Sequence, residues 1–378
     1  MPTSMRSATA VRGRRGGGKV LPEHARAANR ALVLQALFTA GAMSRADLAR
    51  ETGLARVTIS DLVAALIADG YVIERGVRAA SGPGKPAILV DIARDGHRIV
   101  GLDLSGSESF VGAVLTLGGE IVARHAVPVP ADHDEVLEAV LTLVRTVVAD
   151  AHVPILGIGV GTPGVVDDRG VILAAPGFGW AGVDLAGRLE AELGLPVLVA
   201  NDANAAVLAE HTFGGAGDDM ILVRVGRGVG AGLLTGGEPL TGARFAAGEI
   251  GHVTVGTDGG PACACGKIGC LEAWLAVPAL TERLAASPDP DAVLRDAGER
   301  LGIALAPIVG ALDLSEIALS GPAELLGGAL AEAAAETVRI RTLSTSHDGV
   351  RVRMSAHSED IVLRGAAVMV LSDRLGVS

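Results

Sequence analysis

Aromatic residues are scarce in this chain of 378 residues, which has five Phe, two Trp and one Tyr. Nucleic-acid platforms that stack bases on aromatic side chains need several such faces, so the composition argues against that class of protein. Hydrophobic residues still make up 49% of the chain, which excludes a disordered or fibrous protein. The core must be mainly aliphatic, and alternating strand and helix patterns predict an α/β fold with more than one domain.

Cysteine is almost absent, since just three occur within eight positions, Cys263, Cys265 and Cys270. An odd number at this spacing is not a secreted disulfide framework, so we expect a reducing, cytoplasmic environment. No apolar run reaches the roughly 18–20 residues of a membrane-spanning helix, and the first residues lack the apolar segment of a signal peptide. The sequence therefore predicts a soluble protein that does not associate with a membrane.

Positive charge exceeds negative charge only at the beginning of the chain. The net charge is −11, but residues 1–90 carry 13 Lys/Arg against 6 Asp/Glu, a balance of +7, which leaves −18 for residues 91–378. This asymmetry predicts that a polyanion meets only the N-terminal part. A basic disordered leader is the alternative, and we expect residues 1–22 to be a flexible basic tail.

Residues 23–93 have the pattern of a winged helix-turn-helix. Three helices are predicted, followed by two strands that form a wing: 30–38, 44–51, 56–69, 71–74 and 87–92. Arg56, Thr58 and Ser60 begin the third helix, where side chains reach base edges. Phosphate contacts are predicted for Lys85 in the wing and for Arg12, Arg14 and Arg15. A small helical domain that binds another protein is the alternative.

From residue 98 the pattern changes to alternating strands and helices without an internal repeat. The predicted strands are 99–104, 109–117, 120–128, 155–160, 196–200, 219–225, 229–235, 315–319 and 350–354. The predicted helices are 134–151, 184–194, 203–213, 271–286, 291–312, 322–339 and one at the end of the chain.

The strongest chemical signal is a metal site. The spacing Cys263-x-Cys265-x4-Cys270, with His252 eleven positions earlier, supplies three thiolates and an imidazole. This set fills a tetrahedral zinc site and leaves no position for a catalytic water, so the zinc would be structural. The alternative is three buried cysteines without a metal.

Two further motifs could bind a ligand. The run 226–232, which includes Gly226, Gly228 and Gly230, follows a strand but does not open a helix, so it is not a dinucleotide-binding loop. It is either a hairpin that lines a phosphate or ligand cleft or a plain tight hairpin.

Asn201 and Asp202 follow a predicted strand, where α/β sheets place ligand groups. The Asp202 carboxylate could take a proton from a hydroxyl or bind it, although it could equally cap the next helix. With Glu249, His252 and Glu272, these residues offer the donors and acceptors that a polyhydroxylated ligand needs.

Over nearly its whole length the sequence resembles the ROK family of repressors and sugar kinases. The run 248–252 and the run 263–272 are similar to the family's sugar and zinc signature, and 226–232 resembles its phosphate loop. The resemblance implies two actin-like lobes over residues 98–378, with a zinc loop at 252–270. It also implies sugar binding by Asn201, Asp202, Glu249, His252 and Glu272, with His252 binding both zinc and ligand. The runs 44–49 and 53–54 match the repressor branch.

The sequence departs from the kinase pattern at its phosphate-binding positions. Asp103 is retained in the first loop, but Ser105 replaces a glycine that approaches the ATP phosphates. Arg227 stands where family kinases have Thr, and Ser320-Gly321-Pro322 replaces a Gly-Gly pair. We therefore expect ATP binding to be lost or weakened.

The sequence predicts a sugar-responsive DNA-binding transcriptional regulator, a repressor, that is not an enzyme. It would bind a double-stranded palindromic operator as a homodimer or tetramer and respond to a monosaccharide or sugar phosphate. One alternative is an active ATP-dependent sugar kinase with a fused DNA-binding domain, in which Asp202 is the base and Mg-ATP lies over 226–232. Another is a regulator controlled by a partner protein instead of a sugar.

Overall fold

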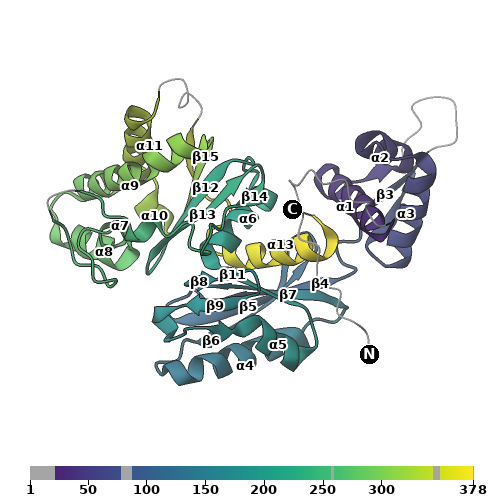
Figure 1. Cartoon of the computed structure of the whole chain (residues 1–378), viewed down its shortest axis with the longest axis horizontal. Helices are drawn as coiled ribbons and strands as arrows, with labels where there is room; N and C mark the ends of the chain where they lie inside the picture. Colours follow the sequence, from purple (N-terminus) through teal and green to yellow (C-terminus); the bar gives the residue numbers. More distant parts are fainter. Residues whose placement is uncertain (1–21, 78–86, 257–258, 344–349, 378) are drawn as a thin grey trace.

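The computed structural model describes residues 22–77, 87–256, 259–343 and 350–377 (Figure 1). It confirms the predicted α/β class, with an N-terminal helical unit followed by two sheets that are each flanked by helices. None of the described helices is long and apolar enough to cross a membrane.

The N-terminal unit is a three-helix arrangement with a three-stranded sheet of order β1-β3-β2. Its elements are α1 (Pro22–Ala40), β1 (Met43–Ser44), α2 (Arg45–Thr52), α3 (Arg56–Ala68), β2 (Val72–Val77) and β3 (Ile88–Ile92). Ser44 and Asp47 form a capping box that starts α2, and Gly53 ends it in the left-handed conformation at φ 69°. These local signals fix the sharp turn between α2 and α3.

The first lobe is a five-stranded sheet of order β11-β7-β4-β5-β6. Its strands are β4 (Arg98–Asp103), β5 (Ser109–Thr116), β6 (Ile121–Pro128), β7 (Ile155–Thr162) and β11 (Val197–Asn201). Helices α4 (Val136–Ala149) and α5 (Leu185–Leu193) share one apolar core with it. A small sheet that the sequence did not predict consists of β8 (Val165–Val166), β9 (Val171–Ala174) and β10 (Val183–Asp184).

The second lobe is a five-stranded sheet of order β14-β13-β12-β15-β16. Its strands are β12 (Met220–Val225), β13 (Val229–Thr235), β14 (Glu238–Pro239), β15 (Glu316–Ser320) and β16 (Arg351–Met354). The helices that pack against this sheet or against one another beside it are α7 (Leu271–Leu275), α8 (Val277–Ala286), α9 (Pro290–Leu312), α10 (Ala323–Leu326) and α11 (Ala329–Arg341).

Two predicted helices are each broken in two. The segment 271–286 is interrupted at Ala276, which has extended backbone. Pro278, the second residue of α8, has no N–H to donate to the Trp274 carbonyl oxygen, so one continuous helix would lose a hydrogen bond there. The segment 322–339 is interrupted at Gly327 and Gly328, which separate α10 from α11.

Helices α6 (Asp202–Gly214) and α13 (Ile361–Leu375) join the two lobes (Figure 1). They pack on each other, α6 against β12 and β13 of the second lobe and α13 against β4 and β7 of the first. The approach is close, since a Cβ at Gly365 would lie 1.9 Å from the Ala205 carbonyl oxygen. Only glycine fits there, so the crossing is held at short range.

One hydrophobic core runs through both the N-terminal unit and the first lobe. It contains the buried stripe of α1, with Val33, Leu34 and Leu37, and it continues into α13 with Leu371 and Leu375. Helix α1 contacts α13 directly. The N-terminal unit is therefore packed onto the body and is not merely tethered to it.

Candidate functional site

Asn201 and Asp202 lie where β11 passes into α6. The Asn201 Oδ1 accepts hydrogen bonds from the backbone N–H groups of Ala203 at 2.9 Å and Asn204 at 3.2 Å, so Asn201 is the N-cap of α6. Its Nδ2 donates to the Gly164 carbonyl oxygen at 2.9 Å. The alternative that Asp202 is only the cap is wrong, because Asp202 is the first helical residue and its carboxylate points to another partner.

That partner is Arg224, which projects from β12 across the boundary between the lobes. Its guanidinium donates to the Asp202 carboxylate and, over 2.8 Å, to Ser105 Oγ beyond the end of β4. Asp103 Oδ2 lies 4.0 Å from the same guanidinium. Burial raises the pKa of Asp202, Arg224 opposes the rise and Asp103 adds to it. Sequence reasoning missed Arg224, although a single charge within the apolar strand 220–225 was a usable signal.

The glycine-rich run is a hairpin between β12 and β13, as predicted. Its turn is closed by a hydrogen bond of 2.9 Å from the Gly226 N–H to the Gly228 carbonyl oxygen, and no helix follows. The Val229 N–H donates to Glu272 Oε2 at 3.0 Å. The structure thus brings the predicted loop and Glu272 together, with Glu272 in the first turn of α7.

Glu249, His252 and Glu272 form the other part of the site. His252 Nδ1 lies 4.0 Å from Glu272 Oε1. Burial raises the pKa of Glu249, the neighbouring His252 lowers it, and Asp202 and Glu272 raise it further. We call the set Asp103, Asn201, Asp202, Arg224, Glu249, His252 and Glu272 the interlobe site. It is rich in carboxylates, and Arg224 is the only Lys or Arg that pairs with them in the part of the chain that the structure describes.

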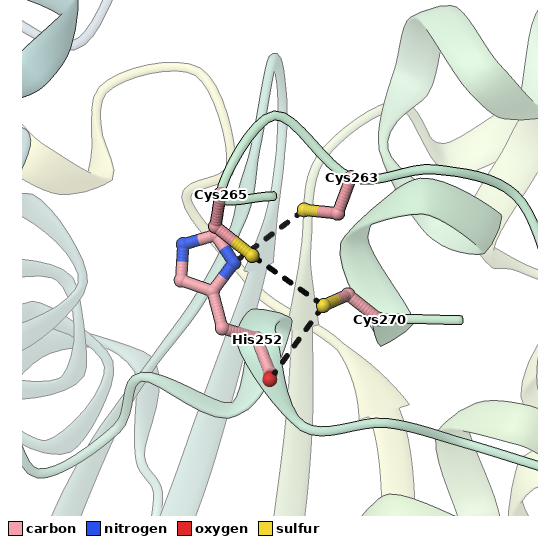
Figure 2. A group of neighbouring side chains, drawn as sticks. All are labelled: His252, Cys263, Cys265 and Cys270. Carbon is pink, nitrogen blue, oxygen red and sulfur yellow. Dashed lines mark hydrogen bonds between the residues drawn. The ribbon is translucent and has the colours of Figure 1, made fainter. Parts of the chain in front are cut away.

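The predicted metal ligands His252, Cys263, Cys265 and Cys270 converge (Figure 2). One ligand atom from each lies within 4.8 Å of all the others. Cys263 Sγ is 3.7 Å from His252 Nδ1, and Cys265 Sγ is 3.6 Å from Cys270 Sγ. A tetrahedral zinc ion with Zn–S bonds of about 2.3 Å separates its sulfur ligands by roughly 3.8 Å, so the donors and their spacing fit zinc.

The alternative of three buried cysteines is wrong, because Cys265 is exposed. The loop that carries the thiols is folded locally by antiparallel bridges between Thr254 and Cys270 and between Ala262 and Ile268. Burial and the neighbouring thiols raise the pKa of Cys270 to about 12. A cation at the centre of the cluster would reverse that effect.

In the N-terminal unit, the predicted DNA-contacting residues begin α3. Arg56 and Ser60 are exposed and Thr58 is half-buried, while Ser60 Oγ donates to the Arg56 carbonyl oxygen at 2.9 Å. The predicted phosphate contacts Lys85, Arg12, Arg14 and Arg15 lie outside the described residues.

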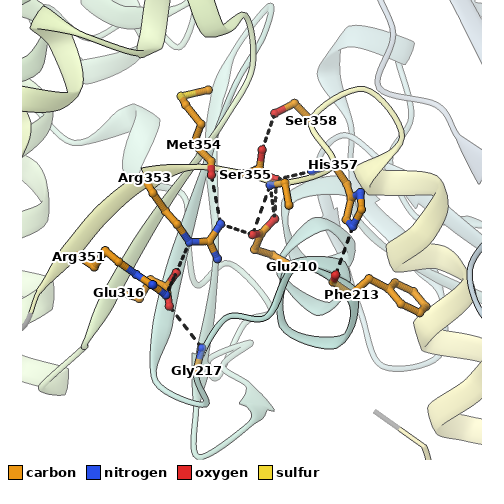
Figure 3. Close-up of polar contacts among 11 residues, drawn as sticks. Glu210, Phe213, Gly217, Glu316, Arg351, Arg353, Met354, Ser355, His357 and Ser358 are labelled. Carbon is orange, nitrogen blue, oxygen red and sulfur yellow. Dashed lines mark hydrogen bonds and ion pairs between the residues drawn. The ribbon is translucent and has the colours of Figure 1, made fainter. Parts of the chain in front are cut away.

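Helix α6 leads from the interlobe site to the N-terminal unit. Near its end, the buried Glu210 accepts hydrogen bonds from Arg353 and, over 2.5 Å, from Ser355 Oγ (Figure 3). One turn further, the ring of Phe213 lies with its centroid 6.3 Å from that of Phe38 in α1. Sequence reasoning missed this connection, because no local pattern relates Phe38 to Phe213.

The comparisons with known proteins identify the family to which this fold and this site belong. Residues 99–373 match the ROK family, and the chain belongs to that family. It is 28% identical, over 92% of this chain and 96% of the relative, to the xylose repressor of Caldicellulosiruptor bescii.

Two solved structures are also similar. One is a ROK family transcriptional regulator described as a homologue of the Escherichia coli Mlc protein, with a TM-score of 0.81 and 25% identity over 93% of this chain and 98% of that chain. The other is a ROK family glucokinase from Streptomyces griseus in complex with glucose and AMPPNP, with a TM-score of 0.63 and 26% identity. The glucokinase match covers 98% of that chain but 72% of this one, whereas the regulator match spans almost the whole chain.

Proposed function

We propose that this protein is a sugar-responsive transcriptional repressor whose winged helix binds a palindromic operator as a homodimer or tetramer. The observation that carries this proposal is the likeness to a xylose repressor and a transcriptional regulator over more than nine-tenths of the chain, a share that must include most of residues 22–92. The exposed start of α3 and the basic balance of residues 1–90 support DNA as the partner.

The interlobe site is proposed to bind the sugar. Carboxylate oxygens, the Asn201 amide and the His252 imidazole suit a ring with several hydroxyl groups. The predominance of carboxylates favours an uncharged monosaccharide over a sugar phosphate, because a phosphate would be repelled by Asp202, Glu249 and Glu272.

Sugar binding is proposed to proceed without phosphoryl transfer. A general base must be free to accept a proton, but Asp202 is held by the guanidinium of Arg224. The Ser105 hydroxyl donates to Asp103 and accepts from Arg224 at the position where a phosphate loop needs bare backbone. Both features weigh against the alternative of an active sugar kinase.

Zinc is proposed to be structural. His252, Cys263, Cys265 and Cys270 would hold it and leave no position for a reacting water. The metal would fix the orientation of His252, which faces Glu272, and would thereby help to position the sugar-binding residues.

Helix α6 is proposed to transmit the sugar signal. Its first residue lies in the interlobe site and its last turn contacts α1, so a rotation of the lobes would displace the winged helix. Because paired half-sites are spaced by about one helical turn of DNA, ~34–36 Å, or its multiples, a small displacement of each winged helix would weaken operator binding.

The test is a fluorescence-anisotropy titration of the full chain on a DNA sequence obtained by in vitro selection, at one stated salt concentration. Monosaccharides and their 6-phosphates are added in parallel, and we expect one neutral sugar to lower DNA affinity by roughly 5- to 150-fold. Operator DNA must lower affinity for that sugar by the same factor.

Variants separate the alternatives. Glu249→Gln should lose the sugar response and keep DNA binding, with exposed Glu324→Gln as the matched control. ATP-dependent phosphorylation that Asp202→Asn abolishes would establish the kinase alternative. DNA binding indifferent to every sugar and phosphate would establish control by a partner protein.

A further inference from the structure

The exposed face of α3 carries an apolar side chain and a carboxylate one turn apart. Val57, the second residue of the helix, is 73% exposed, more than any other large hydrophobic side chain in the part of the chain that the structure describes. The core is filled by the opposite face of α3 with Ile59, Leu62, Val63 and Leu66. Val57 therefore contributes nothing to packing, and its apolar surface is available to a partner.

Asp61 follows Val57 by four positions and lies on the same face. Four other acidic residues of the N-terminal unit, Asp47, Asp69, Glu74 and Asp91, each pair with an arginine. The Asp61 carboxylate is exposed and pairs with no side chain in the part of the chain that the structure describes. A bare carboxylate that faces a polyanion weakens binding unless it accepts a hydrogen bond from a base.

Figure 1 shows α3 on the side of the N-terminal unit that faces away from the two lobes. In a helix-turn-helix the first residues of the second helix contact base edges in the major groove. The groove offers two groups that suit this pair of side chains, the C5-methyl of thymine for an apolar contact and the N4 amino group of cytosine for a carboxylate.

We propose that Val57 and Asp61 determine the operator sequence, Val57 by packing on a thymine methyl group and Asp61 by accepting a hydrogen bond from cytosine N4. This inference rests on the proposed function, since it requires that α3 enters the major groove of DNA. Neither residue was singled out by the sequence, because Val57 has the residue type of a core position and Asp61 has a charge of the wrong sign for DNA.

The experiment uses the full chain and the DNA sequence selected in vitro. Each thymine of the half-site is replaced in turn by deoxyuridine, which removes only the C5-methyl group, and affinity is measured by anisotropy. We expect one thymine at which the replacement weakens binding about fourfold. Val57→Ala should abolish that discrimination, whereas Val122→Ala, an exposed valine in the first lobe, should preserve it.

A second arm tests Asp61. The wild type should prefer cytosine at one position by roughly 5- to 150-fold, and Asp61→Asn should transfer the preference to adenine, whose N6 and N7 suit an amide. Deoxyuridine tolerated at every thymine, or discrimination unchanged in Val57→Ala and Asp61→Asn, overturns the assignment while DNA binding stands. Failure to select any DNA sequence overturns the proposed function and this inference together.

Discussion

Arg224 sets the state of the Asp202 carboxylate at the boundary between the lobes. Two half-buried side chains of opposite charge meet there, with side-chain exposures of 23% and 16%. Because the pair is screened from most solvent, removing one member leaves the other in an unfavourable environment. Arg224 thus stabilises the boundary between the lobes, and its contact with Asp202 argues against that carboxylate acting as a base.

Replacing Arg224 by Met should make stability depend on pH through Asp202. Without the guanidinium, the pKa of Asp202 rises further above its unfolded value, so the folded state binds the proton more tightly. We expect a loss of about 2 kcal/mol in the free energy of unfolding at pH 7.5, decreasing as the pH falls toward 5 and Asp202 becomes protonated. Urea unfolding at several pH values measures this.

The matched control is the double variant Asp202→Asn with Arg224→Met, in which the carboxylate at position 202 is absent and the neighbouring Asp103 is kept. Its difference from Asp202→Asn alone should be the same at pH 5 and pH 7.5. A loss in Arg224→Met that grows on acidification would contradict the explanation.

Cys265 is the one exposed thiol of the proposed zinc site. Cys265→Ser should reduce bound zinc and lower the melting temperature, since metal binding contributes to folding. Zinc content by mass spectrometry and melting curves with and without a chelator measure the two effects. The exposed Ser107, replaced by Ala, is the control. If Cys265→Ser retains full zinc content and full stability, the assignment of Cys265 as a zinc ligand is wrong.

Individual residues were predictable where chemistry and spacing are local. The cysteines and His252 could be grouped because an odd number of cysteines at short spacing is not a disulfide framework and suits a metal site. Arg224 and Phe213 were not found, because their partners Asp202 and Phe38 lie on other elements that only the fold brings close.

At the scale of elements, α6 connects the interlobe site to the N-terminal unit. It begins at Asp202, crosses α13, contains the buried Glu210 and ends at the aromatic contact between Phe213 and α1. A packed helix moves as a rigid unit, so displacement at one end is transmitted to the other.

Phe213→Ala should uncouple sugar binding from DNA binding. Affinity for each ligand alone should change less than threefold, while the sugar-dependent change in DNA affinity should fall to below half of its wild-type value on a logarithmic scale. Calorimetry measures the affinity for the sugar with and without DNA, and anisotropy titrations measure the affinity for DNA with and without the sugar. Leu32→Ala, an exposed apolar residue of α1, is the control that should keep the coupling. Full coupling in Phe213→Ala would exclude this route.

Most elements followed from the sequence because apolar periodicity and caps are local. Ser44, which has the residue type of an N-cap, marked the start of α2, and the aliphatic runs marked β4, β7 and β12. The small sheet β8-β9-β10 was missed because strands of two to four residues are too short for periodicity. The break at Gly327 and Gly328 was missed because the apolar pattern continues across it.

At the scale of the whole molecule, the winged helix and the body share one core. Leu375, the last residue of α13, and Val377, just after it, are buried in the same cluster as Val33 and Leu37 of α1. The Cβ of Ala31 in α1 lies within 2.6 Å of where a side chain at Gly376 would begin. A movement of α13 would therefore displace the winged helix.

Leu375→Ala should destabilise the winged helix as well as the body. The substitution removes buried aliphatic surface, and we expect a loss of about 2–5 kcal/mol in the free energy of unfolding. Hydrogen exchange measured by mass spectrometry should show faster exchange in α1. Leu343→Ala, at an exposed leucine, is the control. Unchanged exchange in α1 would mean that the shared core does not couple the two units.

The shared core also determines when, during synthesis, the N-terminal unit can pack stably. Translation delivers α1, α2 and α3 first and α13 more than 290 residues later, so a nascent chain on the ribosome lacks part of the core against which α1 packs. Stable attachment of the DNA-binding unit must wait for the sugar-binding body to be synthesised. A truncated translation product, from a stalled ribosome or a premature stop codon, would lack α13. Its N-terminal unit would not be packed stably on the body, and the proposed response to sugar would be lost.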